Sequence, residues 1–421
     1  MRRMRRSTKQ RITLSLSLVL STAIVAALLF SGALEGSSPY LQKSVAYAQD
    51  SVEVVREEVQ LKSPLDGLLL DTAKFVWEGD FAYQELEDGR RVRLTLIKSL
   101  QETLQNQMDE RSVPYGSVAA IEPATGRVLA LVSSNSASPK EKDYVLRAKA
   151  PSASVFKLIT AAALLEYSAI DVNARVCYSG GSSMLTEADV RGNPATDKNC
   201  ATLEEAIGHS INAVMARLAY QSLDKAKLDA IALKFGFNRE IPFEIPVDIS
   251  DAEFVDDNIE RAKTAAGFWH VNLSALHGAL IAAAIANRGV MMRPSLVDSI
   301  SAPDGKLIYR FQPQPWLVSM SSAKADTLSK MGENTTTQGS ARRLFAARSD
   351  WPSELRVGGK TGTLSNKRPF YLFNWFVGWA PLENPKIAVG ALVVNTERWW
   401  IKGTHVASRA ILHYYKNNIL Q

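Results

Sequence analysis

Two residues spaced three apart, Ser154 and Lys157, pair a potential nucleophile with a potential base. They precede the apolar run Leu158–Leu165, and this pattern favours a buried helix that begins near Ser154, just after Pro151. Residues three apart share one face of a helix, and burial lowers the pKa of a lysine so that it can accept a proton from a neighbouring hydroxyl. The pattern predicts an activated serine, although a helix cap followed by a surface lysine would give the same spacing.

A second polar pair, Ser210 and Asn212, lies between two expected helices. Thr202 and Glu205 form a capping box at the start of the first helix, and the second helix runs through residues 213–219. Residues two apart do not share one side of a helix, so this pair can converge only if the chain turns between the helices. Simple helix capping by Ser and Asn is the alternative explanation.

A third group is the glycine-rich stretch Lys360, Thr361, Gly362 and Thr363. Its glycines favour a strand that another backbone can approach closely. Apolar strands are expected at 375–380 and 387–394, and two further strands at 115–122 and 127–133 flank a turn at 123–126. Together with a helix at 404–415, these elements predict an α+β fold in which helices pack on an antiparallel sheet.

Composition sets the broad class of the protein. The chain has 421 residues, 46% of them hydrophobic, which is enough for one large domain or two smaller ones and excludes disordered and collagen-like classes. Further elements are expected as hairpins around 87–89 and 303–305, an amphipathic helix Ile97–Met108, a long helix Phe268–Asn287 and a polar helix Ser321–Met331.

The N-terminus has the pattern of a membrane anchor. Basic residues within positions 2–11 supply the whole net charge of +6, and residues 12–421 balance 43 basic against 43 acidic side chains, so the charge does not indicate a nucleic-acid partner. The uncharged stretch Ile12–Leu34 would span about 34 Å as a helix, enough for a hydrocarbon core of about 30 Å. The basic residues before it keep the N-terminus in the cytoplasm. A signal peptide cleaved near residues 46–48 is the alternative.

These observations predict five parts of the chain. They are a cytoplasmic basic arm (1–11), a transmembrane segment (12–34), a tether (35–60), a small N-terminal segment (61–112) and a main domain on the exported side of the cytoplasmic membrane (113–421).

Cys177 and Cys200 are the only cysteines. In an exported chain they are expected to form a disulfide that closes a loop of about twenty residues, with a pair of free buried thiols as the alternative. Neither cysteine lies near another Cys or His at ligand spacing, so no metal site is expected. The five histidines are scattered, and the sequence indicates no cofactor.

Ser-x-x-Lys, Ser-x-Asn and Lys-Thr-Gly, in this order, form the motif set of penicillin-binding proteins and serine β-lactamases. From about Thr95 to the C-terminus the sequence resembles the penicillin-binding transpeptidase family, and it looks most like the transpeptidase halves of bifunctional enzymes. The resemblance implies a five-stranded antiparallel sheet flanked by helices, beside an all-helical subdomain. One departure is Pro151-Ser152-Ala153, where the family commonly has Pro-Gly.

The resemblance also implies the roles of the catalytic residues. Ser154 would attack the carbonyl of a stem peptide that ends in D-Ala-D-Ala and form an acyl-enzyme, and Lys157 would accept the serine proton. Ser210 would relay a proton to the departing D-Ala nitrogen, and Asn212 would hold the substrate amide. Lys360 would supply positive charge for the terminal carboxylate.

Substrate binding would involve the same strand. Thr361 and Thr363 would hydrogen-bond the carboxylate or the peptide backbone, with Gly362 between them. The backbone N–H groups of Ser154 and Thr363 would form the oxyanion hole, where one donor contributes about 3–4 kcal/mol in other enzymes. An amine of a neighbouring stem peptide would then complete the cross-link.

The resemblance implies partners and leaves several activities open. Peptidoglycan stem peptides are the expected substrates, β-lactams the expected inhibitors, and a glycosyltransferase or cell-wall synthesis complex the expected partner. A D,D-carboxypeptidase or a β-lactamase shares the fold. For a β-lactamase, no deacylation base can be assigned, because Glu166 follows the nucleophile too closely. A non-enzymatic module that binds muropeptides or divisome proteins is a further alternative.

Overall fold

The computed structural model describes residues 64, 65, 67–137, 143–181, 184–396 and 401–419. Residues 69 onward belong to one compact unit. The expected transmembrane segment Ile12–Leu34 and the basic arm lie outside the described residues. Within the described part of the chain, no helix has both the length and the apolar character needed to cross a bilayer.

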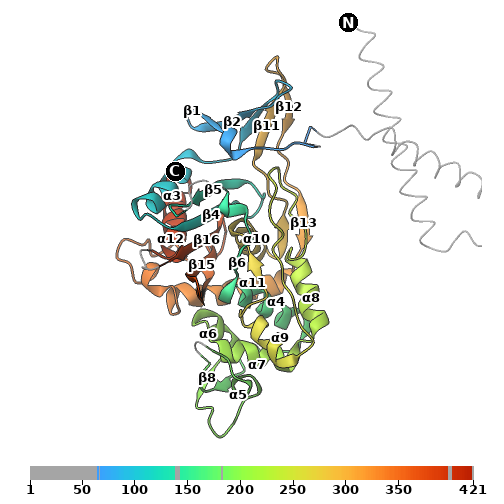
Figure 1. Cartoon of the computed structure of the whole chain (residues 1–421), viewed down its shortest axis with the longest axis vertical. Helices are drawn as coiled ribbons and strands as arrows, with labels where there is room; N and C mark the ends of the chain where they lie inside the picture. The colour runs from blue at the N-terminus through green and yellow to red at the C-terminus, as the bar shows by residue number, and fades with distance from the viewer. Residues whose placement is uncertain (1–63, 66, 138–142, 182–183, 397–400, 420–421) are drawn as a thin grey trace, which may run out of the picture. The chain divides into compact units, whose positions relative to one another are not determined.

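The main sheet has five antiparallel strands, as the sequence predicts (Figure 1). Their spatial order is β14 (Gly358–Lys367), β15 (Phe370–Ala380), β16 (Ile387–Asn395), β4 (Tyr115–Ile121) and β5 (Val128–Ser134). All four pairings are antiparallel. Because β14 is an edge strand, one side of its backbone has no neighbouring strand in this sheet.

Helices cover both faces of the main sheet (Figure 1). α3 (Lys98–Glu110) and α12 (Gly403–Tyr414) pack on one face, where Leu104, Ile411 and Val393 share one buried core. α10 (Ala275–Ala286) packs on the other face and is buried along its whole length. It lies directly on Gly390, where a β-carbon would come within 2.2 Å of the Ala275 carbonyl oxygen. A side chain at that position would therefore push the helix off the sheet.

A group of helices lies beside the main sheet, as expected. Its members are α4 (Lys157–Tyr167), α5 (Glu187–Arg191), α6 (Leu203–Gly208), α7 (Asn212–Ser222), α8 (Lys225–Lys234) and α9 (Asn258–Ala265). α11 (Ser322–Thr337) contacts both α6 and the edge strand β14, so it joins the helices to the sheet. The helical part also contains a two-stranded ribbon of β7 (Val176–Tyr178) and β8 (Asn199–Ala201), which the sequence analysis did not predict.

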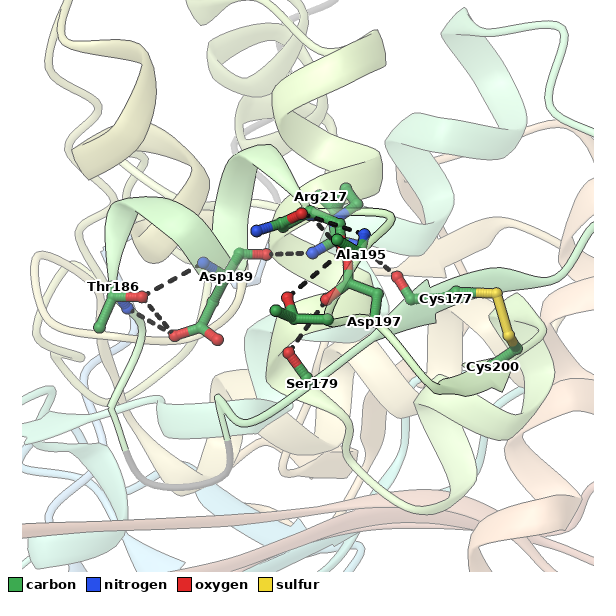
Figure 2. A network of polar contacts seen from close by, with 10 residues as sticks. Cys177, Ser179, Thr186, Asp189, Ala195, Asp197, Cys200 and Arg217 are labelled. Carbon is green, nitrogen blue, oxygen red and sulfur yellow. Dashed lines mark hydrogen bonds and ion pairs between the residues drawn. A yellow bond between two sulfur atoms is a disulfide. The ribbon is translucent and has the colours of Figure 1, made fainter.

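A polar network ties this ribbon to α7 (Figure 2). Cys177 and Cys200 face each other in the ribbon and are joined by a disulfide. Arg217 of α7 donates hydrogen bonds to the Asp197 carboxylate (2.8 Å), to the Asp189 carbonyl oxygen (2.8 Å) and to the Cys177 carbonyl oxygen. The side chains of Arg217 and Asp197 are each 6% exposed, so this ion pair is buried. The network thus links residues 177, 189 and 197 to the helix that begins at Asn212.

A second five-stranded sheet joins two distant parts of the chain. Its order is β1 (Val76–Glu78), β2 (Phe81–Glu85), β3 (Arg91–Leu94), β11 (Val297–Ser301) and β12 (Leu307–Arg310). The turns β2–β3 and β11–β12 confirm the hairpins expected around 87–89 and 303–305. The pairing of β3 with β11 was not predicted, because local patterns cannot show which distant strands meet.

The remaining described elements are short. β10 (Val290–Met292) pairs with β13 (Pro315–Val318), and 3₁₀ helices occur at Thr72–Lys74, Tyr144–Leu146 and Arg342–Leu344. α3 and α12 confirm the helices expected at 97–108 and 404–415 to within two residues. The polar helix expected at 321–331 continues to Thr337, because its last turns bury polar residues that the periodicity did not mark as core.

The prediction of one long helix over residues 268–287 is wrong. α10 begins only at Ala275, because Trp269 and His270 adopt left-handed backbone angles (φ 50° and 60°) that no α-helix contains. The short strand β9 (Asn272–Leu273) follows these two residues. It pairs with β6 (Ala150–Pro151), which lies directly before the Ser154 turn in the chain. An apolar stretch that the sequence presents as one helix is therefore a turn, a short strand and a helix.

Candidate active site

Ser154 lies in a 3₁₀ turn, η3 (Ala153–Phe156), that continues into α4 at Lys157. The helix expected from Ser154 onward is thus present, but its first turn is 3₁₀ in type. Ala153 has φ 49°, a left-handed conformation that costs a non-glycine residue about 1 kcal/mol or more. The indole N–H of Trp375 donates to the Pro151 carbonyl oxygen (2.8 Å) and so fixes the turn to β15 of the main sheet.

Lys157 is fully buried, and its amine contacts three oxygen atoms. Its Nζ lies 2.6 Å from Ser154 Oγ, 2.6 Å from Asn212 Oδ1 and 2.6 Å from the Ala266 carbonyl oxygen. A neutral amine has two N–H donors and one lone pair. The two carbonyl-type oxygens can only accept hydrogen bonds, so they take both donors. The lone pair is then left for the Ser154 hydroxyl, which is the geometry of a base poised on a nucleophile.

Burial, together with the nearby charge of Lys360, lowers the pKa of Lys157 well below its ordinary value. Burial also lowers the pKa of Lys360, to about 7. Because the two lysines repel each other when both are charged, protonation of one disfavours protonation of the other. The charge of Lys360 acts on Lys157 in addition to burial, and the three oxygens around Lys157 fit a neutral amine, so we assign the neutral form to Lys157 and the proton to Lys360.

Ser210 and Asn212 converge on the two lysines from opposite sides of a turn. α6 ends at Gly208, α7 begins at Asn212, and Ser210 has φ 60° between them. This left-handed residue reverses the chain and lets both side chains point to one site, which is the condition that the sequence analysis set. Asn212 reaches Lys157, whereas Ser210 Oγ accepts a hydrogen bond from Lys360 Nζ (2.8 Å).

Lys360 reaches the site from β14, the edge strand of the main sheet. Its Nζ also donates to the Thr361 carbonyl oxygen (2.9 Å), and the side chain is fully buried. Gly362 lies against η3, where a β-carbon would come within 3.2 Å of the Ser152 carbonyl oxygen and of the Val155 side chain. The glycine-rich strand therefore allows the close approach of backbones that its sequence predicts. Thr363 has an exposed side chain.

One contact near the site was missed in the sequence. Ser340 lies just after α11, and its hydroxyl is 2.6 Å from the Thr361 hydroxyl. Its backbone N–H and its hydroxyl both donate to the Gly208 carbonyl oxygen (3.0 and 3.2 Å), two residues before Ser210. Ser340 thus joins the Ser210 turn to the Lys-Thr-Gly strand. The only local signal in the sequence is Gly339, directly before Ser340. A β-carbon added at this glycine would lie 2.0 Å from the Gly208 carbonyl oxygen.

The other candidate groups lie outside this cluster. Glu166, at the far end of α4, accepts hydrogen bonds from the Ser321 N–H and hydroxyl (2.7 Å each) and so caps the start of α11. His277 is buried in α10, where burial lowers its pKa to about 4, and its Nε2 lies 2.7 Å from the Phe235 carbonyl oxygen. No group of three or more His, Cys, Asp or Glu side chains converges as a metal site among residues whose positions the structure gives.

Comparison with known proteins identifies relatives of this chain. The family model of the penicillin binding protein transpeptidase domain matches residues 116–413. The peptidoglycan D,D-transpeptidase PbpA of Mycolicibacterium smegmatis is 29% identical over 313 residues, which cover 66% of this chain and 61% of the relative. Stage V sporulation protein D of Bacillus subtilis is 24% identical over 336 residues, covering 74% of this chain and 51% of the relative. The chain thus spans between half and two thirds of the length of these curated relatives.

Several solved structures are similar to this chain in fold. The imipenem acyl-enzyme complex of penicillin-binding protein A from M. tuberculosis superposes with a TM-score of 0.66 at 25% identity, over 78% of this chain and 79% of that chain. The D,D-transpeptidase domain of a peptidoglycan glycosyltransferase from Eggerthella lenta has a TM-score of 0.65 at 24% identity, over 78% and 83% of the two chains, and supports the fold alone. Since the family model covers most of the chain, this protein belongs to the penicillin-binding protein transpeptidase domain family.

Proposed function

We propose that this chain is a penicillin-sensitive D,D-transpeptidase that cross-links peptidoglycan stem peptides through an acyl-enzyme on Ser154. The contact between Ser154 Oγ and the buried amine of Lys157 (2.6 Å) carries the proposal. It is the one arrangement at the site that turns a hydroxyl into a nucleophile without a histidine. The relatives named D,D-transpeptidases and the acyl-enzyme complexes of penicillin-binding protein A support the assignment.

The first half-reaction forms the acyl-enzyme. Ser154 Oγ attacks the carbonyl carbon of the penultimate D-Ala while Lys157 takes the hydroxyl proton. The N–H groups of Ser154 and Thr363 stabilise the oxyanion. Lys360 holds the terminal carboxylate as a cation, with Thr361 beside it. Ser210 then delivers a proton to the leaving nitrogen of the terminal D-Ala, and the bond between the two D-Ala residues breaks.

The second half-reaction releases the cross-linked product. An amine of a second stem peptide attacks the acyl carbonyl and gives up a proton, and the Ser154 oxygen leaves as a hydroxyl. Asn212 accepts a hydrogen bond from Lys157 in the structure, so we assign it two tasks: orienting that amine and holding the substrate amide. Water in place of the amine would make the enzyme a D,D-carboxypeptidase.

β-Lactamase activity is the less favoured alternative on this fold. Fast deacylation needs a base that activates water beside the ester. Glu166 is the first carboxylate after Ser154 in the sequence. Its Oε1 accepts both hydrogen bonds from Ser321 at the start of α11, and its Oε2 pairs with Lys324 (3.5 Å). It is therefore not available as that base, and a long-lived acyl-enzyme is expected.

Donor exchange tests the proposed reaction. The full chain in detergent micelles would be incubated with an N-acylated peptide ending in D-Ala-D-Ala and an excess of a different D-amino acid. We expect mass spectrometry to detect the exchanged peptide with the wild type and not with Ser154→Ala. Hydrolysis without exchange would establish a carboxypeptidase instead, and no reaction by a folded wild type would refute the enzymatic role.

We also propose that residues 12–34 anchor the protein in the cytoplasmic membrane with its catalytic domain outside. The Cys177–Cys200 disulfide supports this side of the membrane, because disulfides persist in oxidising compartments. Cross-linking acts on glycan strands, so a glycosyltransferase or cell-wall synthesis complex is the proposed partner. Retention of the full chain in the membrane fraction after carbonate washing is expected, and its release would contradict the anchor.

A further inference from the structure

Ser340 contacts two parts of the site that come from different elements, and the proposed reaction gives it no role. It follows α11, which packs on both α6 and β14. Its hydroxyl lies 2.6 Å from the Thr361 hydroxyl and 3.2 Å from the Gly208 carbonyl oxygen. One side chain thus reaches the last residue of α6 and the second residue of the Lys-Thr-Gly motif.

The position of this hydroxyl is set by the backbone around it. The Ser340 N–H donates to the Gly208 carbonyl oxygen (3.0 Å). Glycine is required on both sides of this contact. A β-carbon at Gly208 would come within 1.9 Å of Asn334 Oδ1, and one at Gly339 within 2.0 Å of the Gly208 carbonyl oxygen. The end of α6 and the chain after α11 therefore meet closely, and they hold Ser340 beside Thr361.

The Ser340 hydroxyl has one hydrogen to donate, and two oxygen atoms lie near it. Hydrogen bonds from a hydroxyl to an oxygen usually measure about 2.5–3.0 Å. The contact with Thr361 (2.6 Å) lies within this range, whereas the contact with Gly208 (3.2 Å) lies outside it. The Gly208 oxygen already accepts a hydrogen bond from the Ser340 N–H. The hydroxyl of Ser340 is therefore free to donate to Thr361.

The direction of this hydrogen bond decides what Thr361 can offer to a substrate. If its hydroxyl accepts from Ser340, its own hydrogen stays available, because it makes no other hydrogen bond with the described residues. A carboxylate can only accept, so this hydrogen can go to the terminal carboxylate of the donor. The bond that Thr361 accepts also polarises the one that it donates. In the opposite direction, Thr361 would present only lone pairs, which repel an anion.

From this geometry we infer that Ser340 is a positioning residue for the terminal carboxylate of the donor peptide. Its hydroxyl fixes Thr361 as a hydrogen-bond donor, and Thr361 binds the carboxylate beside Lys360. The contact of Ser340 with Gly208 keeps this donor in place relative to the turn that carries Ser210. The inference rests on the proposed function and adds a residue by which the site selects an anionic chain end over a neutral one.

Benzylpenicillin and its methyl ester test this selection. The carboxylate of a penicillin takes the place of the donor's terminal carboxylate, and the ester has the same skeleton without the charge. The second-order acylation rate constants of both would be measured on the full chain in detergent micelles by mass spectrometry of the intact protein. We expect Ser340→Ala to lower the ratio of the benzylpenicillin to the ester rate constant about threefold or more, because a hydrogen bond to a charged group is worth more than one to a neutral group.

Two further variants separate this role from a general loosening of the site. Ser340→Thr keeps the hydroxyl and should retain the wild-type ratio. Ser353→Ala, at an exposed position before β14, is the matched control and should also retain it. Loosening alone would slow both compounds and leave their ratio unchanged. An unchanged ratio in Ser340→Ala, or an equal fall in either of the other two variants, would overturn the inference and leave the proposed function in place.

A double-mutant cycle shows whether Ser340 acts through Thr361. Thr361→Val keeps the shape of the side chain and removes its hydroxyl. In this background we expect Ser340→Ala to leave the ratio unchanged, because the group that it orients is absent. A second fall of the same size would mean that Ser340 binds the carboxylate directly, and it would overturn the positioning role. If benzylpenicillin does not acylate the folded wild type, the proposed function fails and this inference fails with it.

Discussion

Lys157 and Lys360 are both buried, yet the residues around them give them different roles. The amine of Lys157 faces two oxygens that can only accept hydrogen bonds and one hydroxyl that can donate one. The neutral amine can therefore form a hydrogen bond with each of the three. Lys360 faces the Ser210 hydroxyl and a carbonyl oxygen, which favour a donating ammonium group. Charge repulsion between the two adds to this division. The proposed proton acceptor and the proposed cation thus lie near each other, and no histidine takes part in the contacts of either lysine.

The pH dependence of acylation follows from this division. The reactive free enzyme has a neutral Lys157 and a charged Lys360. We expect the second-order rate constant for benzylpenicillin to rise with pH as Lys157 loses its proton, and to fall as Lys360 loses its own through about pH 7. Stopped-flow measurements from pH 5 to 10 would give this bell shape. In Lys360→Arg the alkaline fall should disappear, because a guanidinium stays charged. A wild-type rate that climbs steadily to pH 9 would contradict the assignment.

The base at Lys157 is open to a direct test. We expect Lys157→Met to lower the acylation rate constant by about 10²–10⁴-fold, the usual contribution of a general base. Circular dichroism should show that the variant is folded, because methionine occupies a similar volume. The exposed Lys330, on α11, serves as the control, and Lys330→Met should acylate like the wild type. A fall of less than tenfold in Lys157→Met would assign the base elsewhere.

At the scale of elements, three short motifs were predictable from the sequence and the turns that aim them were not. The glycine-rich strand and the buried helix after Ser154 were expected from residue type and apolar spacing. The convergence of Ser210 with Asn212 depends on one left-handed residue between α6 and α7, whereas the spacing of the two residues shows only that a turn is required. Spacing along a chain fixes which residues are near neighbours, but it does not fix a single reversed φ angle.

Tertiary contacts account for the other differences. The helix expected at 268–287 gave way to a turn and a strand because Asn272 and Leu273 pair with residues 150 and 151. Ser340 has no spacing relative to Ser210 or Thr361 that marks it as their neighbour. Both cases depend on contacts between segments apart in the sequence, by 21 residues for Ser340 and Thr361 and by more than a hundred for the others, and no local pattern records them.

The buried Arg217 should be a strong determinant of stability in the helical part. Its removal leaves the Asp197 carboxylate buried without its cation, and two carbonyl oxygens lose a donor (Figure 2). We expect Arg217→Ala to lower the free energy of unfolding by about 3–5 kcal/mol, the cost of breaking a buried pair. Chemical denaturation under non-reducing conditions would measure it.

Arg191, on α5, is the matched control for this prediction. It pairs with Glu187 one turn away, and both side chains are more than half exposed. Arg191→Ala should therefore cost less than about 0.5 kcal/mol. Equal losses in the two variants would show that the buried network is not what fixes the ribbon of β7 and β8 to α7.

At the scale of the whole molecule, Glu244 joins the second sheet to the main domain. Its carboxylate accepts hydrogen bonds from the Ser295 hydroxyl (2.7 Å) and from the Leu296 N–H (3.0 Å), just before β11. Its own carbonyl oxygen accepts from Leu70 (2.8 Å). Burial raises its pKa, although the hydrogen bonds oppose this effect. The carboxylate of Glu244 thus holds the start of β11, and its backbone carbonyl holds the chain before β1.

Replacing this group should loosen the second sheet and spare the active site. We expect Glu244→Ala to speed backbone hydrogen exchange in β3 and β11, because two buried donors lose their acceptor at a cost of about 1–3 kcal/mol each. Exchange in β15 and β16 and acylation by penicillin should stay as in the wild type. Glu240→Ala, at an exposed position nearby in the chain, is the control. Faster exchange throughout the main sheet would mean that the two sheets unfold as one.

The proposed function depends on a stable acyl-enzyme at Ser154. The most direct measurement is labelling of the full-length protein with a fluorescent penicillin, in the wild type and in Ser154→Ala, followed over time. We predict a covalent label on the wild type that persists for many minutes, and no label on the variant. Equal labelling of both proteins, no label on a folded wild type, or a label that is lost within seconds with turnover of the penicillin would contradict the account.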